Sequence, residues 1–259
     1  GGGGDAFIAT FRTTTANESI TLPYLSTGTY SGTIDWGDGT VVANTYANRA
    51  HTYVNSGDYN ITILGDCAGW QFNSSGDRLK IYDIVNWGIG FIMKSAVAFS
   101  GCKNLDVTAT DVLDLSLATS LTRAFFSCNN LIGNASFNDW DTSNVTNMTQ
   151  FFHNCNSFNQ PLNNWDTSNV TNMYRMFKSC FNFNQPLNNW NTSNVTNMRE
   201  MFSANTNAFN QDISNWDFSG LNNANSLRTF FQTQTSATYD ATYYDNLLIK
   251  WASSPSVGG

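Results

Sequence analysis

A block of about 25 residues recurs through the middle of this chain and limits its fold more than any other feature. The copies that begin at Trp140, Trp165 and Trp190 each contain the string Thr-Ser-Asn-Val-Thr-Asn-Met, and a shorter copy begins at Trp216. A period of roughly 20–50 residues is typical of proteins in which similar units lie side by side. One such unit is too small to bury its own apolar face, so the sequence predicts that the copies share one core.

Weaker copies precede the clear ones. Counting them gives about six, which begin at residues 87, 113, 140, 165, 190 and 216. Met173, Met176, Phe177 and Cys180 have the spacing of one face of a short helix. The segment that follows contains Pro186 and is too short for another helix, which predicts an extended leg. The predicted fold class is therefore an α/β solenoid, leucine-rich-repeat-like, with parallel β-strands on one side and short helices on the other.

The two ends of the chain lack the repeat. Residues 5–66 contain alternating apolar segments typical of strands, including a hairpin over 33–42 with a Gly-Asp-Gly turn. Residues 237–251 have the apolar spacing of a helix. The predicted domains are a small antiparallel β-sandwich cap over 1–66, the solenoid of 25–27-residue repeats over 67–235, and a C-terminal capping helix with a tail over 236–259.

Two families resemble parts of the chain. Asp35–Thr40 (DWGDGT), followed by HTY at 51–53 and GDY at 57–59, resembles the PKD-type β-sandwich modules of secreted and surface proteins. Val170–Met173 (VTNM), followed by Met176, Phe177 and Cys180, resembles the surface protein repeat of the BspA-like leucine-rich-repeat proteins. The second resemblance implies a role in adhesion at a bacterial cell surface.

Composition narrows the classes of partner. Charged residues make up only 12% of the chain, the formal net charge is -7, and no run of Lys and Arg is present to meet phosphates. We therefore expect no nucleic-acid partner. No apolar run reaches the roughly 18 residues of a membrane span, so no membrane insertion is expected. No signal peptide is visible, and the initial Gly-Gly-Gly-Gly reads as a linker or a processed end.

Four of the five cysteines follow the period of the repeat: Cys102, Cys128, Cys155 and Cys180. Equivalent positions in neighbouring copies come close enough for a disulfide in principle. We favour small buried thiols that fill one core position. Zinc is not expected, because no C-x-x-C pair is present.

Catalytic chemistry has little support in the sequence. The two histidines, His51 and His153, have no carboxylate or nucleophile at a recognisable spacing, so we expect neither an enzyme nor a cofactor. Asp141 and Asp166 follow their tryptophans and are interpreted as loop hydrogen-bonding groups. Asp35 and Asp38 are interpreted as turn residues, with calcium binding as the alternative.

The repeated tryptophans fill a core or line a sugar-binding groove, and their identity from copy to copy favours the core. The variable positions are better contact candidates: Thr149, Gln150, His153, Tyr174, Arg175, Lys178, Arg199 and Glu200. The expected function is non-enzymatic recognition or adhesion by an extracellular protein, secreted or at a cell or virion surface, toward a protein or glycan. The alternative is a structural building block of a surface layer, fibre or virion appendage, for which self-assembly is expected.

Overall fold

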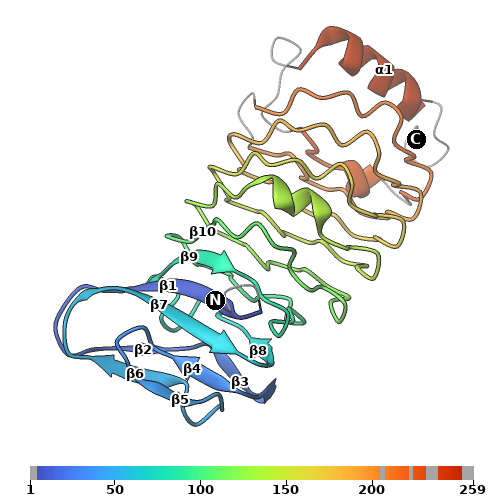
Figure 1. Cartoon of the computed structure of the whole chain (residues 1–259). Coiled ribbons are helices and arrows are strands. Elements are labelled where there is room, and N and C mark those ends of the chain that lie inside the picture. The colour runs from blue at the N-terminus through green and yellow to red at the C-terminus, as the bar shows by residue number, and fades with distance from the viewer. Residues whose placement is uncertain (1–4, 205–207, 222–223, 232–238, 253–259) are drawn as a thin grey trace.

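The computed structural model describes residues 5–204, 208–221, 224–231 and 239–252 (Figure 1). Most regular structure lies in the first 107 residues and is β-sheet. The strands are β1 (Phe7–Thr13), β2 (Glu18–Thr21), β3 (Tyr24–Tyr30), β4 (Thr33–Asp35), β5 (Val41–Ala43), β6 (Ala50–Tyr53), β7 (Gly57–Leu64), β8 (Cys67–Trp70), β9 (Ile81–Asn86) and β10 (Asp106–Val107).

The largest sheet has six strands in the order β10-β9-β1-β7-β4-β5. It is mixed, because β10 runs parallel to β9 whereas the other pairs are antiparallel. Strand β1 alternates in burial: Phe7, Ala9 and Phe11 face the core, and Ile63 and Ile61 lie opposite the first two on β7. This period of two is what a sheet with one buried face requires.

Two smaller sheets pair β2 with β6 and β3 with β8. The predicted antiparallel sandwich confined to residues 1–66 is therefore wrong. Strands β8, β9 and β10 follow residue 66, and they pair with β3, with β1 and with β9. The short apolar segments beyond residue 66 complete these sheets, which gives the N-terminal strands partners that the local pattern did not show.

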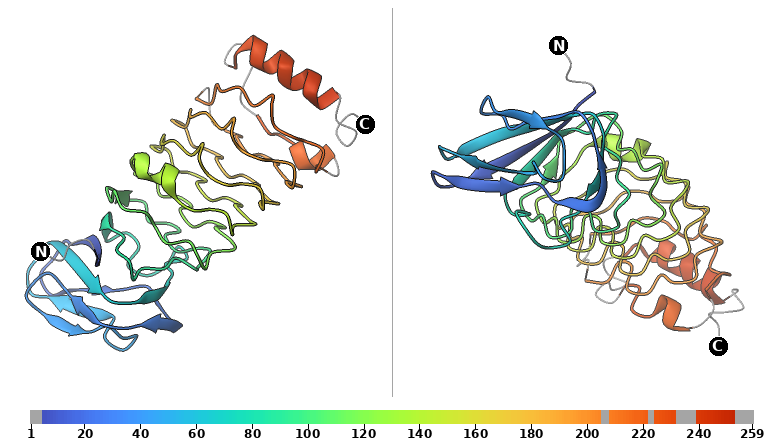
Figure 2. Two further views of the ribbon diagram at one scale, coloured as in Figure 1. Left: turned by 45° about the vertical axis from the view of Figure 1, so that its right-hand side comes forward. Right: turned by 90° about the horizontal axis from the view of Figure 1, so that it is seen from below.

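Successive copies of the repeat lie side by side (Figure 2). The backbone amides of one copy alternate in where they donate. Arg175 N donates to Arg199 O of the next copy at 3.0 Å, and Phe177 N donates to Met201 O at 3.0 Å. Between them, Met176 N donates back to Met173 O at 3.2 Å within its own copy. Every second amide thus connects copies, and the remaining amides close tight turns.

The predicted α/β solenoid with parallel strands and short helices is wrong. The repeats contain turns joined by single parallel bridges, such as Asn147–Asn172, instead of strands. No helix forms over Met173–Cys180, because Arg175 and Ser179 have φ values of 54° and 60°. An α-helix needs negative φ at every residue. Equivalent positions repeat this geometry: Arg123, Gln150, Glu200 and Thr229, and Ser127, Asn154 and Ala204.

The repeated apolar residues fill the shared core, as predicted. The rings of Trp140, Trp165, Trp190 and Trp216 are buried and stacked at centroid distances of 6.2, 6.4 and 6.1 Å. All five cysteines are free and buried, so the prediction of core thiols is confirmed. The Cys155 thiol donates to Phe125 O of the preceding copy at 3.0 Å.

Helical structure is sparse within the described residues. Two short 3-10 helices, η1 (Ala135–Asp139) and η2 (Ala224–Leu227), precede the one α-helix, α1 (Ala241–Ala252). Helix α1 lies at the far end from the sheets (Figure 1) and buries Leu247. Trp251 contacts the rings of Phe218 and Phe230. The expected C-terminal helix is thus present, although part of the predicted segment, 236–238 and 253–259, lies outside the described residues. None of the described helices has the length and apolar character needed to cross a membrane.

Candidate ligand-binding surface

The variable positions of the repeat come together along one edge of adjacent copies. In the copy that begins at Trp165, the side chains of Met173, Met176 and Phe177 are buried in the core. The residues between them, Tyr174 and Arg175, are partly exposed. We name this edge the basic strip. It comprises Arg123, Phe126, Gln150, His153, Tyr174, Arg175, Lys178, Arg199, Glu200 and Arg228. Thr149 lies beside it, with its carbonyl accepting from Arg123 N at 2.9 Å.

A buried carboxylate organises the centre of the strip. Glu200 is 5% exposed and receives two hydrogen bonds from Arg175, at 2.9 and 3.0 Å. Lys178 Nζ lies 2.5 Å from Glu200 Oε2, and Arg199 Nε lies 3.3 Å from Oε1. Burial alone would raise the pKa of Glu200, but hydrogen bonds from Arg175 and Lys178 lower it to about 2. Glu200 is therefore ionised at neutral pH and holds three cations in place.

His153 lies next to this cluster in its neutral form. Burial, together with the charges of Lys178 and Arg175, lowers the pKa of His153 to about 4. Its Nδ1 lies 3.0 Å from Nε2 of Gln150, which fits an amide donor and an unprotonated ring nitrogen. The histidine therefore adds no charge to the strip at neutral pH. Variability between copies predicted that His153 faces solvent, but its side chain is only partly exposed.

Aromatic rings hold the guanidinium groups against the surface. Arg123 lies over the Phe126 ring at 4.4 Å, and Arg175 and Arg199 lie 4.7 and 5.9 Å from the Tyr174 ring centroid. Such cation–π contacts orient the guanidinium plane without neutralising its charge. The edge of the Phe126 ring also meets His153, with centroids 5.0 Å apart. The strip thus contains two groups of contacting side chains, one around Phe126 and His153 and one around Tyr174 and Glu200.

The strip concentrates positive charge on an acidic chain. It contains five Arg and Lys residues and one carboxylate, a net charge of +4, so the remaining residues must carry -11 to bring the chain to -7. Among the described residues, Glu200 is the one carboxylate that forms ion pairs with these cations, and it pairs with three of the five. Sequence reasoning selected Arg175, Lys178, Arg199 and Glu200 but missed Arg123, Phe126 and Arg228, which lie in the degenerate copy that begins at 113 and in the stretched last copy.

The other groups singled out from the sequence have structural partners. His51 lies 2.7 Å from Asp38 and stacks on Trp36, which supports its structural interpretation. Asp35 accepts a turn hydrogen bond from Gly37 N at 2.9 Å. Asp166 accepts one from Ser168 N at 2.9 Å, and the acidic and amide residues at equivalent positions do the same: Asp141, Asn191 and Asp217. Within the described part of the chain, no group of three or more His, Cys, Asp or Glu side chains is arranged to hold a metal ion.

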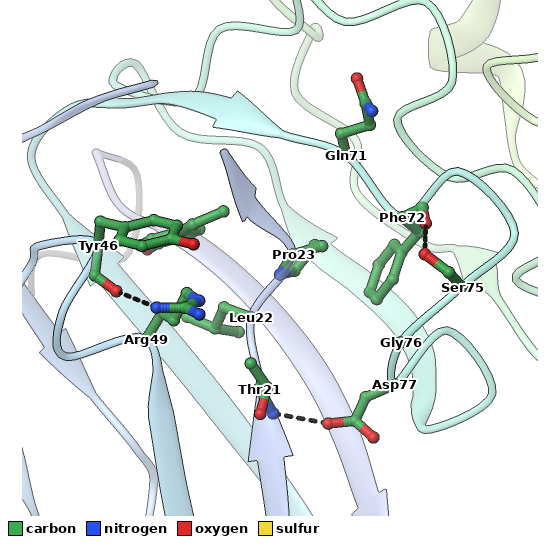
Figure 3. Close-up of a pocket in the computed structure, with 11 residues that line it drawn as sticks. Thr21, Leu22, Pro23, Tyr46, Arg49, Gln71, Phe72, Ser75, Gly76 and Asp77 are labelled. Carbon is green, nitrogen blue, oxygen red and sulfur yellow. Dashed lines mark hydrogen bonds between the residues drawn. The ribbon is translucent and has the colours of Figure 1, made fainter. Parts of the chain in front are cut away.

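A pocket of about 430 Å³ lies among the N-terminal strands, away from the basic strip (Figure 3). One of its two charged lining residues, Asp77, is already paired. Asp77 accepts from Thr21 N at 2.7 Å and lies 3.1 Å from Lys80 Nζ, while Arg49 covers the Tyr46 ring at 3.8 Å. Of the charged lining residues, only Arg49 keeps an uncompensated charge, so the pocket offers a ligand less free charge than the strip, where five cations share one carboxylate.

Comparison with known proteins matches part of the chain. Residues 119–244, just under half of the sequence, are similar to a family described as Mycoplasma protein of unknown function, DUF285. No leucine-rich-repeat family model matches, so the expected membership of the BspA-like leucine-rich-repeat proteins, with a PKD-like module, is corrected by this finding. No curated protein and no solved structure matches the chain. The basic strip, from Arg123 to Arg228, lies entirely within the part that is similar to DUF285.

Proposed function

We propose that the chain is a non-enzymatic, extracellular recognition module that binds a protein or glycan partner through the basic strip. The observation that carries this proposal is the cluster at Glu200, in which one buried carboxylate fixes Arg175, Lys178 and Arg199. Because two of these three positive charges are left uncompensated, the cluster presents a preorganised positive surface. An acidic surface elsewhere on the same chain would keep unselected anionic molecules away.

Arg and Lys side chains of the strip are already ordered before a partner binds. Long Arg and Lys side chains lose about 1.5–2 kcal/mol of rotamer freedom each when they are immobilised. In the strip, rings and Glu200 restrict these side chains in the free protein. A partner would therefore meet donors whose geometry is set, which is the property that separates a recognition surface from a solvated charge cluster.

The proposal is tested by screening the purified protein on glycan and surface-protein arrays beside the double variant Arg123→Gln/Arg228→Gln. Neither arginine has an ion pair among the described residues, so the variant should keep the fold. The matched control is Lys94→Gln/Lys103→Gln, which removes two exposed charges outside the strip. Binding that is lost in the strip variant and kept in the control supports the proposal.

Absence of any partner, together with discrete large assemblies in size-exclusion chromatography, would contradict it. That result would favour the structural alternative, in which the chain is a building block of a surface layer, fibre or appendage. A partner bound equally by both double variants would exclude Arg123 and Arg228 from the interface. If Lys178→Gln, which leaves Glu200 paired with Arg175 and Arg199, also bound that partner unchanged, the proposal would be contradicted.

A further inference from the structure

The cations of the strip come from the copies that begin at 113, 165, 190 and 216, whereas the copy that begins at 140 has the uncharged Thr149 and Gln150 and the neutral His153 at these positions. Arg199 and Arg228 occupy the position of Tyr174, because the amides of Arg175 and Glu200 donate to the Arg199 and Arg228 carbonyls. Arg123 occupies the position of Arg175 by the same pattern. Neighbouring copies joined by these backbone hydrogen bonds lie about 4.8 Å apart. The positive charges thus form a row along the direction in which the copies succeed one another.

A row of fixed charges is complementary to a ligand whose own charges recur at a fixed step. A flexible partner would lose its conformational freedom to match the row, whereas a stiff periodic polymer loses less. The planar guanidinium groups are suited to two-point contact with carboxylate or sulfate groups. The uncharged residues Gln150, Thr149 and Tyr174 between the cations suit a polymer whose charges are more widely spaced than the phosphates of duplex DNA.

A folded or peptide partner would need anchors of another kind. Tight protein interfaces place aromatic or apolar side chains in desolvated pockets. The pockets at Thr21–Asp77, at Pro186–Tyr243 and at Asp5–Gly90 contain no residue of the strip. Nucleic acid has a dense charge of one phosphate per roughly 1.7 Å of duplex. The net charge of -11 outside the strip would repel such a polymer beyond the few copies that attract it.

We propose that the ligand is a linear acidic polysaccharide, with carboxylate or sulfate groups on successive or alternating sugars, lying along the row of copies. This inference rests on the proposed function and names its substrate class. Carboxylate or sulfate groups meet Arg123, Arg175, Arg199 and Arg228, and sugar faces lie against the exposed side of the Tyr174 ring. Glu200 positions the cations and does not touch the ligand, because it is buried beneath them.

The test is a titration with five probes: heparin, polygalacturonate, neutral dextran, poly-L-glutamate and single-stranded DNA, measured by biolayer interferometry. Heparin or polygalacturonate should bind, dextran should not, and the affinity should fall as salt is raised. Arg123→Gln/Arg228→Gln should weaken binding about tenfold, which corresponds to two surface charge contacts of about 0.7 kcal/mol each. Lys94→Gln/Lys103→Gln should change it by less than about twofold. Thermal melts verify that both variants are folded.

Each other outcome decides between the two proposals. Equal or tighter binding of poly-L-glutamate or DNA would overturn the polysaccharide assignment and leave strip-dependent recognition standing. Binding of a surface protein on the array, with no acidic polysaccharide bound, would do the same. Acidic polysaccharides bound equally by wild type and the strip variant would overturn this inference. Failure of every probe and every array partner would remove both the ligand class and the proposed function.

Discussion

The residues with positive φ allow a test that distinguishes the observed turns from the predicted helix. A glycine substitution at such a residue should stabilise the turns but would destabilise a helix. Ser179 has φ of 60°, and its amide donates to Ser203 O of the next copy at 3.0 Å. Replacing Ser179 by glycine leaves this backbone bond intact. Within the described residues the Ser179 hydroxyl has no hydrogen-bond partner, so the substitution removes no side-chain contact of that kind.

The magnitude follows from two opposing terms. Left-handed φ costs a residue with a Cβ about 1–2 kcal/mol, which glycine avoids. Glycine in turn gives the unfolded chain more freedom, which costs about 0.4–1 kcal/mol. Ser179→Gly should therefore stabilise the protein by about 0.5–1 kcal/mol. If residues 173–180 formed the helix predicted from their spacing, the same change would destabilise by about 0.5 kcal/mol.

Urea denaturation followed by tryptophan fluorescence measures this difference, with thermal melts as a second readout. The melting temperature should rise by about 1–3 °C. The control is Ser168→Gly, at an ordinary φ in the same copy, which should destabilise by about 0.4–1 kcal/mol. Destabilisation by both substitutions would refute the turn geometry.

Three further predictions concern the core and the strip. Trp165→Phe removes an indole that donates to Phe137 O at 2.6 Å, so we expect about 2–4 kcal/mol of destabilisation in the same assay. The pKa of His153 is about 4 in the folded protein and about 6.5 unfolded, so stability should be fully present above pH 6.5 and decrease as pH falls to 4; His153→Gln should flatten that part of the profile. Burial raises the pKa of Cys155 and Cys180, so Ellman's reagent should modify neither in native protein and should react with all five thiols in denaturant.

The sequence was sufficient to predict which residues are buried. Trp165, Met173, Phe177 and Cys180 recur because a shared core accepts little change, and each is buried. The spacing of these residues led us to predict a helix, which was wrong. Buried side chains three and four residues apart occur in these consecutive turns as well as in a helix. Residues with positive φ are most often glycine or asparagine. Because this position holds arginine at Arg175, the local sequence did not predict a turn there.

The candidate site was partly predictable. Variability between copies selected Gln150, Tyr174, Arg175 and Glu200, which the structure places in the same strip. It did not select Arg123, Phe126 and Arg228, because the copy that begins at 113 is degenerate and the last copy is stretched by three residues. The ion pairs to Glu200 join residues 22 and 25 positions apart, and only the alignment of neighbouring copies reveals them.

The alternating amides make neighbouring copies interchangeable as building units. Thr171 N donates to Thr146 O at 2.8 Å, and Thr196 N donates to Thr171 O at the same distance. If the gene lost or duplicated one whole repeat, the copies on either side would therefore form the same backbone hydrogen bonds with each other. Unequal crossing-over could lengthen or shorten this protein without inventing a new interface. If the proposed polymer lies along the row, each gained or lost copy that carries cations would change the number of contacts before any single residue is altered.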